Sequence, residues 1–447
     1  MRISRSKMIP VAALALLALV GALVAGLVLR MGTPAVSPLA TRQLAAAADQ
    51  QPINNTEQLL WQYQDRVRQS PDDVNSYAVL GNIYLQRARE TGDPSYYGKA
   101  EAVFAEALKR DPQNIEALIG KGSLALSRHQ FQEALALGQQ AASLNPTIPR
   151  IYGVIADAQT ELGMYDEAIQ TLQKMVDMRP DLSSYSRISY MRELHGDIPG
   201  AISAMQGAVN AGGPASENTQ WVRVQLGNLY FNQGNLAEAE HEYQQALYQL
   251  PGYVYATAGV ARVRAAQGQY NEAVALYNQA IAQIPLPEFV IALGETQEAA
   301  GQTADAAKQY ELVQAMQQLF KANGVDTDLE LALFDADHGR DVQGTLALAR
   351  SAYERRPSVK GADTLAWALF KAGQPAEARR YSDQALRLGT QDALMLYHAG
   401  VIAQAQGDSA AARDYLKRAL TLNPHFSPLF ALRAQQTLAE LGSTATK

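Results

Sequence analysis

The feature that most constrains this chain is a pattern of small and aromatic residues that recurs 34 positions later. In the clearest copy the pattern consists of Gly227, Ala239, Tyr243, Ala246 and Pro251, and its next copy of Ala261, Ala273, Tyr277, Ala280 and Pro285. A period of this length is typical of helix–turn–helix repeats, each of which must stack on its neighbours to bury an apolar face. The repeat therefore predicts an all-α solenoid.

A glycine followed five residues later by a small residue recurs along most of the chain. We expect each glycine to end a first helix in the left-handed conformation, and each small residue to lie where the second helix crosses the first. The pairs are Gly163/Ala168, Gly196/Ala201, Gly234/Ala239, Gly268/Ala273, Gly301/Ala306, Gly339/Gly344, Gly373/Ala378 and Gly407/Ala412. Upstream, Ala100 and Ala134 hold the small position without a turn glycine. The pattern predicts about ten repeats.

Length and composition exclude several fold arrangements and classes of function. A length of 447 residues would allow two or three globular domains, but a solenoid forms one domain of any length. The net charge of −6 argues against nucleic-acid binding, which favours a basic face. The chain has no cysteine, which excludes disulfides, thiol nucleophiles, thiolate metal sites and lipid attachment through cysteine.

The N-terminus carries an apolar run. Residues 1–7 contain three basic side chains, and residues 8–29 are uncharged and long enough to span a bilayer as a helix. We expect an uncleaved transmembrane anchor, with a cleaved signal peptide as the alternative. The positive-inside rule places residues 1–7 in the cytoplasm and the repeats outside it, in the periplasm or at the exterior of a bacterial cell. Ala22 and Gly26 form a small-xxx-small pair that is compatible with self-association.

The remaining segments follow from composition and periodicity. We expect a linker at 30–55, an amphipathic N-terminal capping helix at 56–71 and repeats over 72–427. A C-terminal capping helix is expected at 428–441, with Pro428 in its first turn, and 442–447 form a polar tail. The repeat at 326–357 diverges most from the pattern.

Over about residues 72–427 the chain resembles the tetratricopeptide repeat superfamily. The resemblance rests on repetition, and the second and eighth copies depart from it at Gly138 and Gly344. It implies a right-handed superhelix whose concave groove is lined by first helices, and a scaffold for a protein or peptide partner. The lysines with which some members clamp a terminal carboxylate are missing at Ala78 and Val224, so that function is not implied.

The resemblance also implies which residues face the groove, because the residue after the small residue of each first helix usually does so. Asn228 and Arg262 could then bind a peptide backbone or carboxylate, and Leu333, Trp367 and Tyr397 could form an apolar pocket. The alternative is that the polar residues are simply solvated and that the C-terminal helix covers the apolar ones. The full set of groove positions is Asn82, Ser123, Asp157, Tyr190, Asn228, Arg262, Glu295, Leu333, Trp367 and Val401.

One cluster suggests a metal site. Asp335, Asp337 and His338 are suitable ligand types within four residues. The stronger interpretation is turn chemistry, because the cluster lies just before Gly339 at the expected end of a first helix. No phosphate-binding loop, dinucleotide fingerprint or nucleophile motif is present, so we expect neither a cofactor nor catalysis.

These features favour a membrane-anchored, non-catalytic scaffold whose groove holds a protein or peptide. Two alternatives stay open. One is an envelope solenoid that binds a glycan or small ligand. The other is an accessory subunit of an envelope polymer-assembly enzyme, motivated by the divergent repeat and its Asp335, Asp337 and His338.

Overall fold

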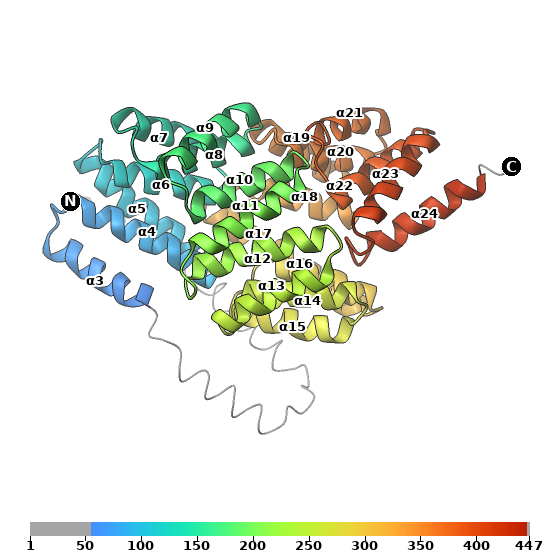
Figure 1. Ribbon diagram of the computed structural model, residues 1–447, viewed down its shortest axis with the longest axis horizontal. Helices are drawn as coiled ribbons and strands as arrows, with labels where there is room; N and C mark the ends of the chain where they lie inside the picture. Colours follow the sequence, from blue (N-terminus) through green and yellow to red (C-terminus); the bar gives the residue numbers. More distant parts are fainter. Residues whose placement is uncertain (1–54, 445–447) are drawn as a thin grey trace, which may run out of the picture. The chain divides into compact units, whose positions relative to one another are not determined.

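The computed structural model describes residues 55–444 (Figure 1). Every regular element in this range is an α-helix, from α3 (Asn55–Gln69) to α24 (Phe430–Thr444), which confirms the predicted all-α class. The chain divides into a unit of residues 1–58 and a unit of residues 59–447, and the second unit carries the repeats. The expected anchor at 8–29 lies outside the described residues. No helix within them is both long and apolar enough to cross a bilayer.

Twenty helices, α4 to α23, form ten consecutive pairs. The first helices are α4 (Val74–Thr91), α6 (Ile115–Ser127), α8 (Pro149–Glu161), α10 (Leu182–Leu194), α12 (Glu217–Asn232), α14 (Val254–Ala266), α16 (Pro287–Ala299), α18 (Asp328–Asp337), α20 (Val359–Lys371) and α22 (Ala393–Ala405). The second helices are α5 (Ser95–Arg110), α7 (Phe131–Leu144), α9 (Tyr165–Met178), α11 (Ile198–Ala211), α13 (Leu236–Gln249), α15 (Tyr270–Gln283), α17 (Thr303–Ala322), α19 (Val342–Arg355), α21 (Pro375–Ala385) and α23 (Ser409–Leu422).

The turn glycines behave as the sequence predicts. All eight adopt the left-handed conformation, with φ between 65° and 79°. The second repeat lacks a glycine there, and His129 takes the position with φ of 58°. The fold therefore requires this conformation even where a side chain makes it unfavourable.

The small residues of the first helices allow close packing. Tyr243 of α13 is fully buried, and its ring fills the space beside Gly227 and Gly259. A Cβ atom at Gly227 would lie 2.5 Å from the Tyr243 ring, and one at Gly259 would lie 2.7 Å from it. Because real Cβ contacts are longer, neither position accepts a side chain without repacking.

Contacts between residues 192–198 positions apart join successive turns of the superhelix. Each contact links a helix pair to the element six pairs further along, so six pairs complete one turn. Figure 1 shows the result where α19 lies beside α9. We call this set of contacts the seam. Its hydrogen bonds run from Asp326 N to Arg128 O (3.0 Å), Val359 N to Tyr165 Oη (2.8 Å), Thr390 Oγ1 to Leu194 O (2.6 Å) and Asn423 Nδ2 to Phe231 O (2.8 Å).

An arginine reinforces the seam. Arg356, which precedes α20, donates to Glu161 of α8 at 2.6 Å and to Glu330 of α18 at 2.7 Å. Its guanidinium also lies 5.2 Å from the ring centre of Phe131. The side chain is only 14% exposed, so these charges are partly desolvated and interact more strongly than a surface pair would. The seam thus combines backbone, ionic and aromatic contacts.

Candidate binding groove

Five consecutive first helices of the first superhelical turn line one concave surface. Side chains of α4, α6, α8, α10 and α12 surround a cavity of about 520 Å³. A second cavity of about 370 Å³ adjoins it and shares Leu126, Ser186, Arg187 and Trp221 with it. We call the two cavities together the groove. Its lining by first helices is the arrangement that the repeat pattern predicts.

Trp221 is the most exposed aromatic side chain of the groove. It lies on α12, is 42% exposed and lines both cavities. From the sequence we predicted Asn228 as the groove residue of this helix and did not predict Trp221. The two residues are seven positions apart, which places them near the same helical face two turns away from each other. Asn228 lines neither cavity, so this spacing would not have identified Trp221 as a groove residue.

The groove wall contains a fixed ion pair. Arg187 of α10 donates to both carboxylate oxygens of Asp157, at 2.8 and 2.7 Å, and to the carbonyl of Ser183. A bidentate pair of this kind is rigid as well as strong. The charges of Arg187 and Asp157 therefore offset each other, and the pair presents a polar surface without a net charge.

Four predicted groove residues line the groove, namely Asn82, Ser123, Asp157 and Tyr190. Asn82 donates to the carbonyl of Ala78 in its own helix. Lys360 of the next superhelical turn lies 5.1 Å from the ring centre of Tyr190. Burial raises the pKa of Tyr190, so its hydroxyl stays neutral. Asn228 differs, because it accepts from Tyr243 Oη at 2.7 Å and donates to Gln225 within its own repeat.

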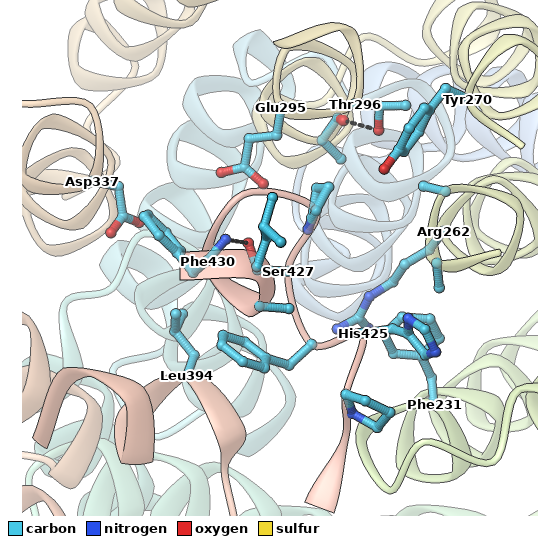
Figure 2. Close-up of a pocket in the computed structure, with 18 of the residues that line it drawn as sticks. Phe231, Arg262, Tyr270, Glu295, Thr296, Asp337, Leu394, His425, Ser427 and Phe430 are labelled. Carbon is cyan, nitrogen blue, oxygen red and sulfur yellow. Dashed lines mark hydrogen bonds between the residues drawn. The ribbon is translucent and has the colours of Figure 1, made fainter. Parts of the chain in front are cut away.

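Arg262 and Glu295 lie in a separate cavity of about 330 Å³ (Figure 2). This cavity is formed by α14–α16 together with the segment 424–428 that leads into α24. Arg262 stacks on Phe231, with its guanidinium 3.9 Å from the ring centre, and its Nη2 lies 3.3 Å from Asn232 Oδ1. Arg262 and Glu295 are therefore separated from the predicted residues that line the groove.

Glu295 is an uncompensated carboxyl group. Burial raises its pKa to about 8, and the charges of Asp337 and Glu298 act in the same direction. Its Oε1 lies 3.7 Å from Nε2 of His338, whose pKa burial lowers to about 4. At neutral pH Glu295 is therefore mostly protonated and His338 is neutral.

We expect Glu295→Gln to stabilise the protein at pH 8 but not at pH 5. The native state holds a proton on Glu295 that the unfolded chain releases between its ordinary pKa of 4.5 and about 8, so wild-type stability falls as pH rises through this window. The full shift corresponds to about 4 kcal/mol at pH 8. Because 18% of the Glu295 side chain is exposed to solvent, we expect the variant to gain about half of this, about 2 kcal/mol, in urea denaturation. Glu311→Gln, at an exposed position, is the control. An equal effect of Glu295→Gln at both pH values would contradict the prediction.

Trp367 and Tyr397 belong to the core. They are 2% and 5% exposed, and Phe430 of α24 packs on Tyr397 with ring centres 5.3 Å apart. Trp367 stacks on His398 at 4.2 Å and donates its Nε1 hydrogen to Asp337 at 2.8 Å. The apolar pocket expected at these positions is therefore filled by the C-terminal helix of the same chain.

The three candidate metal ligands point to different neighbours. Asp337 accepts from Trp367, while His338 packs on Tyr310 with ring centres 4.1 Å apart. Asp335 has one buried oxygen without a hydrogen-bond partner, and burial raises its pKa to about 6. Within residues 55–444 no three His, Asp or Glu side chains are placed to hold a metal ion. The sequence cluster is thus not a ligand set.

Two protein-family models, both described as tetratricopeptide repeat, match the chain. One matches residues 125–188 and 230–289, and the other matches residues 95–149 and 364–425. The chain belongs to the tetratricopeptide repeat superfamily. No curated protein matches the sequence.

Solved structures also show similarity to the chain. A thermophilic protein of Thermus thermophilus is 23% identical, covers 42% of this chain and 98% of its own, and has a TM-score of 0.38. The human IFIT1 dimer with m7Gppp-AAAA is 17% identical, with coverages of 74% and 77% and a TM-score of 0.48. YrrB, described as having an unusual peptide-binding site, is 21% identical, with coverages of 42% and 94% and a TM-score of 0.28.

Proposed function

We propose that this tetratricopeptide repeat protein is a non-catalytic scaffold that binds an extended segment of a partner protein in its groove. The observation that carries the proposal is the continuous lining of the groove by five first helices, with Trp221 exposed within it. The apolar run at residues 8–29 would anchor the scaffold in a membrane and place the groove outside the cytoplasm.

The dimensions of the groove suit an extended polypeptide. Packed helices lie about 8–10 Å apart, so five first helices span roughly 35–40 Å. An extended chain advances about 3.3 Å per residue, which gives a segment of about 11 residues. Such a segment could contact the polar side chains of every first helix from α4 to α12.

The chemistry of the groove also favours a polypeptide. Trp221 offers a large apolar surface together with an indole N–H donor, and aromatic side chains of this kind dominate binding energy at protein interfaces. Asn82 and Ser123 line the same cavity and offer short polar groups to a backbone. Because Arg187 is fixed by Asp157, this part of the wall needs little reordering on binding.

Site-specific photo-crosslinking tests the proposal. A photoreactive amino acid at position 221 should capture the partner in cells, whereas the same residue at position 248 should not. Tyr248 is 79% exposed on the second helix α13 and therefore lies away from the groove lining. The captured protein should then lose at least about tenfold in affinity for the Trp221→Ala variant and none for Tyr248→Ala. Equal capture at both positions, or unchanged affinity of Trp221→Ala, would refute binding in the groove.

The alternative of an accessory enzyme subunit loses its motivation. It rested on Asp335, Asp337 and His338 in the divergent eighth repeat. The structure accounts for Asp337 by its hydrogen bond from Trp367 and for His338 by its packing on Tyr310. Binding of a glycan in the groove would appear in the same experiment as a failure to capture any protein at position 221.

A further inference from the structure

Three basic side chains from different elements line one cavity of about 430 Å³ beside α24. Arg340 follows α18, Lys371 ends α20 and Arg433 lies on α24. This cavity is distinct from the groove, whose lining belongs to α4–α12 and the seam. It opens where the C-terminal helix covers the second superhelical turn.

Each cation is held over an aromatic ring. Arg340 lies 5.6 Å from the ring centre of Phe334, Lys371 lies 4.6 Å from that of Trp367, and Arg433 lies 5.3 Å from that of Phe430. These three rings are themselves buried. The rings restrict the basic side chains while their polar atoms stay available to a ligand.

The three cations have no ionic partner in the part of the chain that the structure describes. Two carboxylates line the same cavity, and each accepts a hydrogen bond from a neutral aromatic side chain but forms no ion pair with the three cations. Glu298 accepts from Tyr310 Oη at 2.8 Å, and Asp337 accepts from Trp367 Nε1 at 2.8 Å. No carboxylate oxygen among residues 55–444 lies within 4.0 Å of the nitrogen atoms of the three cations.

The burial and clustering of positive charge in this cavity affect the pKa values of Lys371 and His338. Burial lowers the pKa of Lys371, the charge of Asp337 partly offsets this effect, and the charge of Arg433 lowers the pKa further. Burial also lowers the pKa of His338, with contributions from all three cations. The side chain of His338 is 7% exposed, lines the cavity and has an Nε2 atom without a hydrogen-bond partner. Elsewhere in the chain Arg356, with two carboxylate partners, shows how such charges are usually compensated.

We propose that this cavity binds an oxyanion, such as a phosphoryl or polycarboxylate group of a ligand. The anion would supply the direct ionic contact that Arg340, Lys371 and Arg433 lack, in a cavity whose three cations outnumber its two carboxylates. Guanidinium groups match the geometry of such oxyanions and donate two hydrogen bonds at once. The bound anion would also connect α18, α20 and α24, so it would fasten the C-terminal helix to the second turn.

Isothermal titration calorimetry on the full-length chain tests the site. The probes are inorganic pyrophosphate and citrate, each titrated at constant ionic strength maintained with sodium chloride. We expect saturable binding of one anion per chain, and a loss of about tenfold in affinity for Lys371→Gln and for Arg433→Gln. Tighter binding of pyrophosphate would identify a phosphoryl group, and tighter binding of citrate a polycarboxylate.

Two control variants locate the anion. Lys417→Gln changes an exposed cation on α23 that does not line the cavity, and Arg262→Gln changes the cation of the neighbouring cavity. Both should retain wild-type affinity, and circular dichroism should show that all variants keep their helix content. Absence of saturable binding by both anions would overturn the proposal. So would an equal loss of affinity in Lys417→Gln or Arg262→Gln.

Discussion

Gly163→Ala is expected to lower the free energy of unfolding by about 2–5 kcal/mol, because two costs coincide at this turn. Gly163 has φ of 73°, where an alanine costs about 1–2 kcal/mol. An added Cβ would also lie 2.5 Å from the carbonyl oxygen of Pro357 in the next superhelical turn. Backbone cannot move aside as a flexible side chain can, so overpacking adds about 1–3 kcal/mol.

Gly373→Ala is the matched control. Gly373 has φ of 74°, but nothing lies within 4 Å of the position of its Cβ. This variant should show the conformational cost alone, about 1–2 kcal/mol in urea denaturation. Hydrogen exchange should further distinguish the two variants. The amide of Val359 donates to Tyr165 Oη across the seam, so it should exchange faster in Gly163→Ala but not in Gly373→Ala. Identical behaviour of the two variants would show that the seam does not form in solution.

The seam also affects the groove. Arg356 lines the groove although it belongs to the second superhelical turn, and Lys360 of the same turn lies over the ring of Tyr190. The second turn therefore supplies part of the groove wall. Weakening the seam at Gly163 should consequently change partner binding as well as stability, whereas a change at Gly373 should alter stability alone.

The local features of the repeat could be predicted from the sequence because they depend on residues close together in the chain. The eight turn glycines, the helix pairs and the tight packing at Gly227 all follow from a 34-residue period. Four of the positions expected to face the groove, Asn82, Ser123, Asp157 and Tyr190, line its two cavities. Neighbouring repeats decide most of this environment, and only Tyr190 among these residues also contacts a cation of the second turn, Lys360.

Features that depend on distant residues could not be predicted in this way. Gly163 and Gly373 look equivalent in the sequence, yet only Gly163 meets another turn. Trp367 occupies a position that usually faces the groove, but α24 covers it. Contacts between residues 192–198 positions apart cannot be detected in a 34-residue pattern, because any one repeat can satisfy its own packing without them.

The buried pair of Asp363 and His398 should give the other large effect, with Asp363→Ala lowering the free energy of unfolding by about 3–5 kcal/mol. His398 is fully buried, and its Nδ1 lies 3.0 Å from Asp363 Oδ2. Without Asp363 the imidazole would lose this partner inside the core, where Trp367 stacks on it. Asp414→Ala, which breaks an exposed pair with Arg418, is the control and should cost less than about 1 kcal/mol.

The cost of Asp363→Ala should depend on pH. Burial alone would lower the pKa of His398, but the charge of Asp363 outweighs it and holds the pKa above the ordinary value of 6.5. The stabilisation by the pair is therefore fully present below pH 6.5 and is lost as pH rises through the native pKa. Urea denaturation should show a larger loss for Asp363→Ala at about pH 6 than at about pH 9. A loss that is the same at both pH values would mean that His398 is not charged in the native protein and that the pair is an ordinary neutral hydrogen bond.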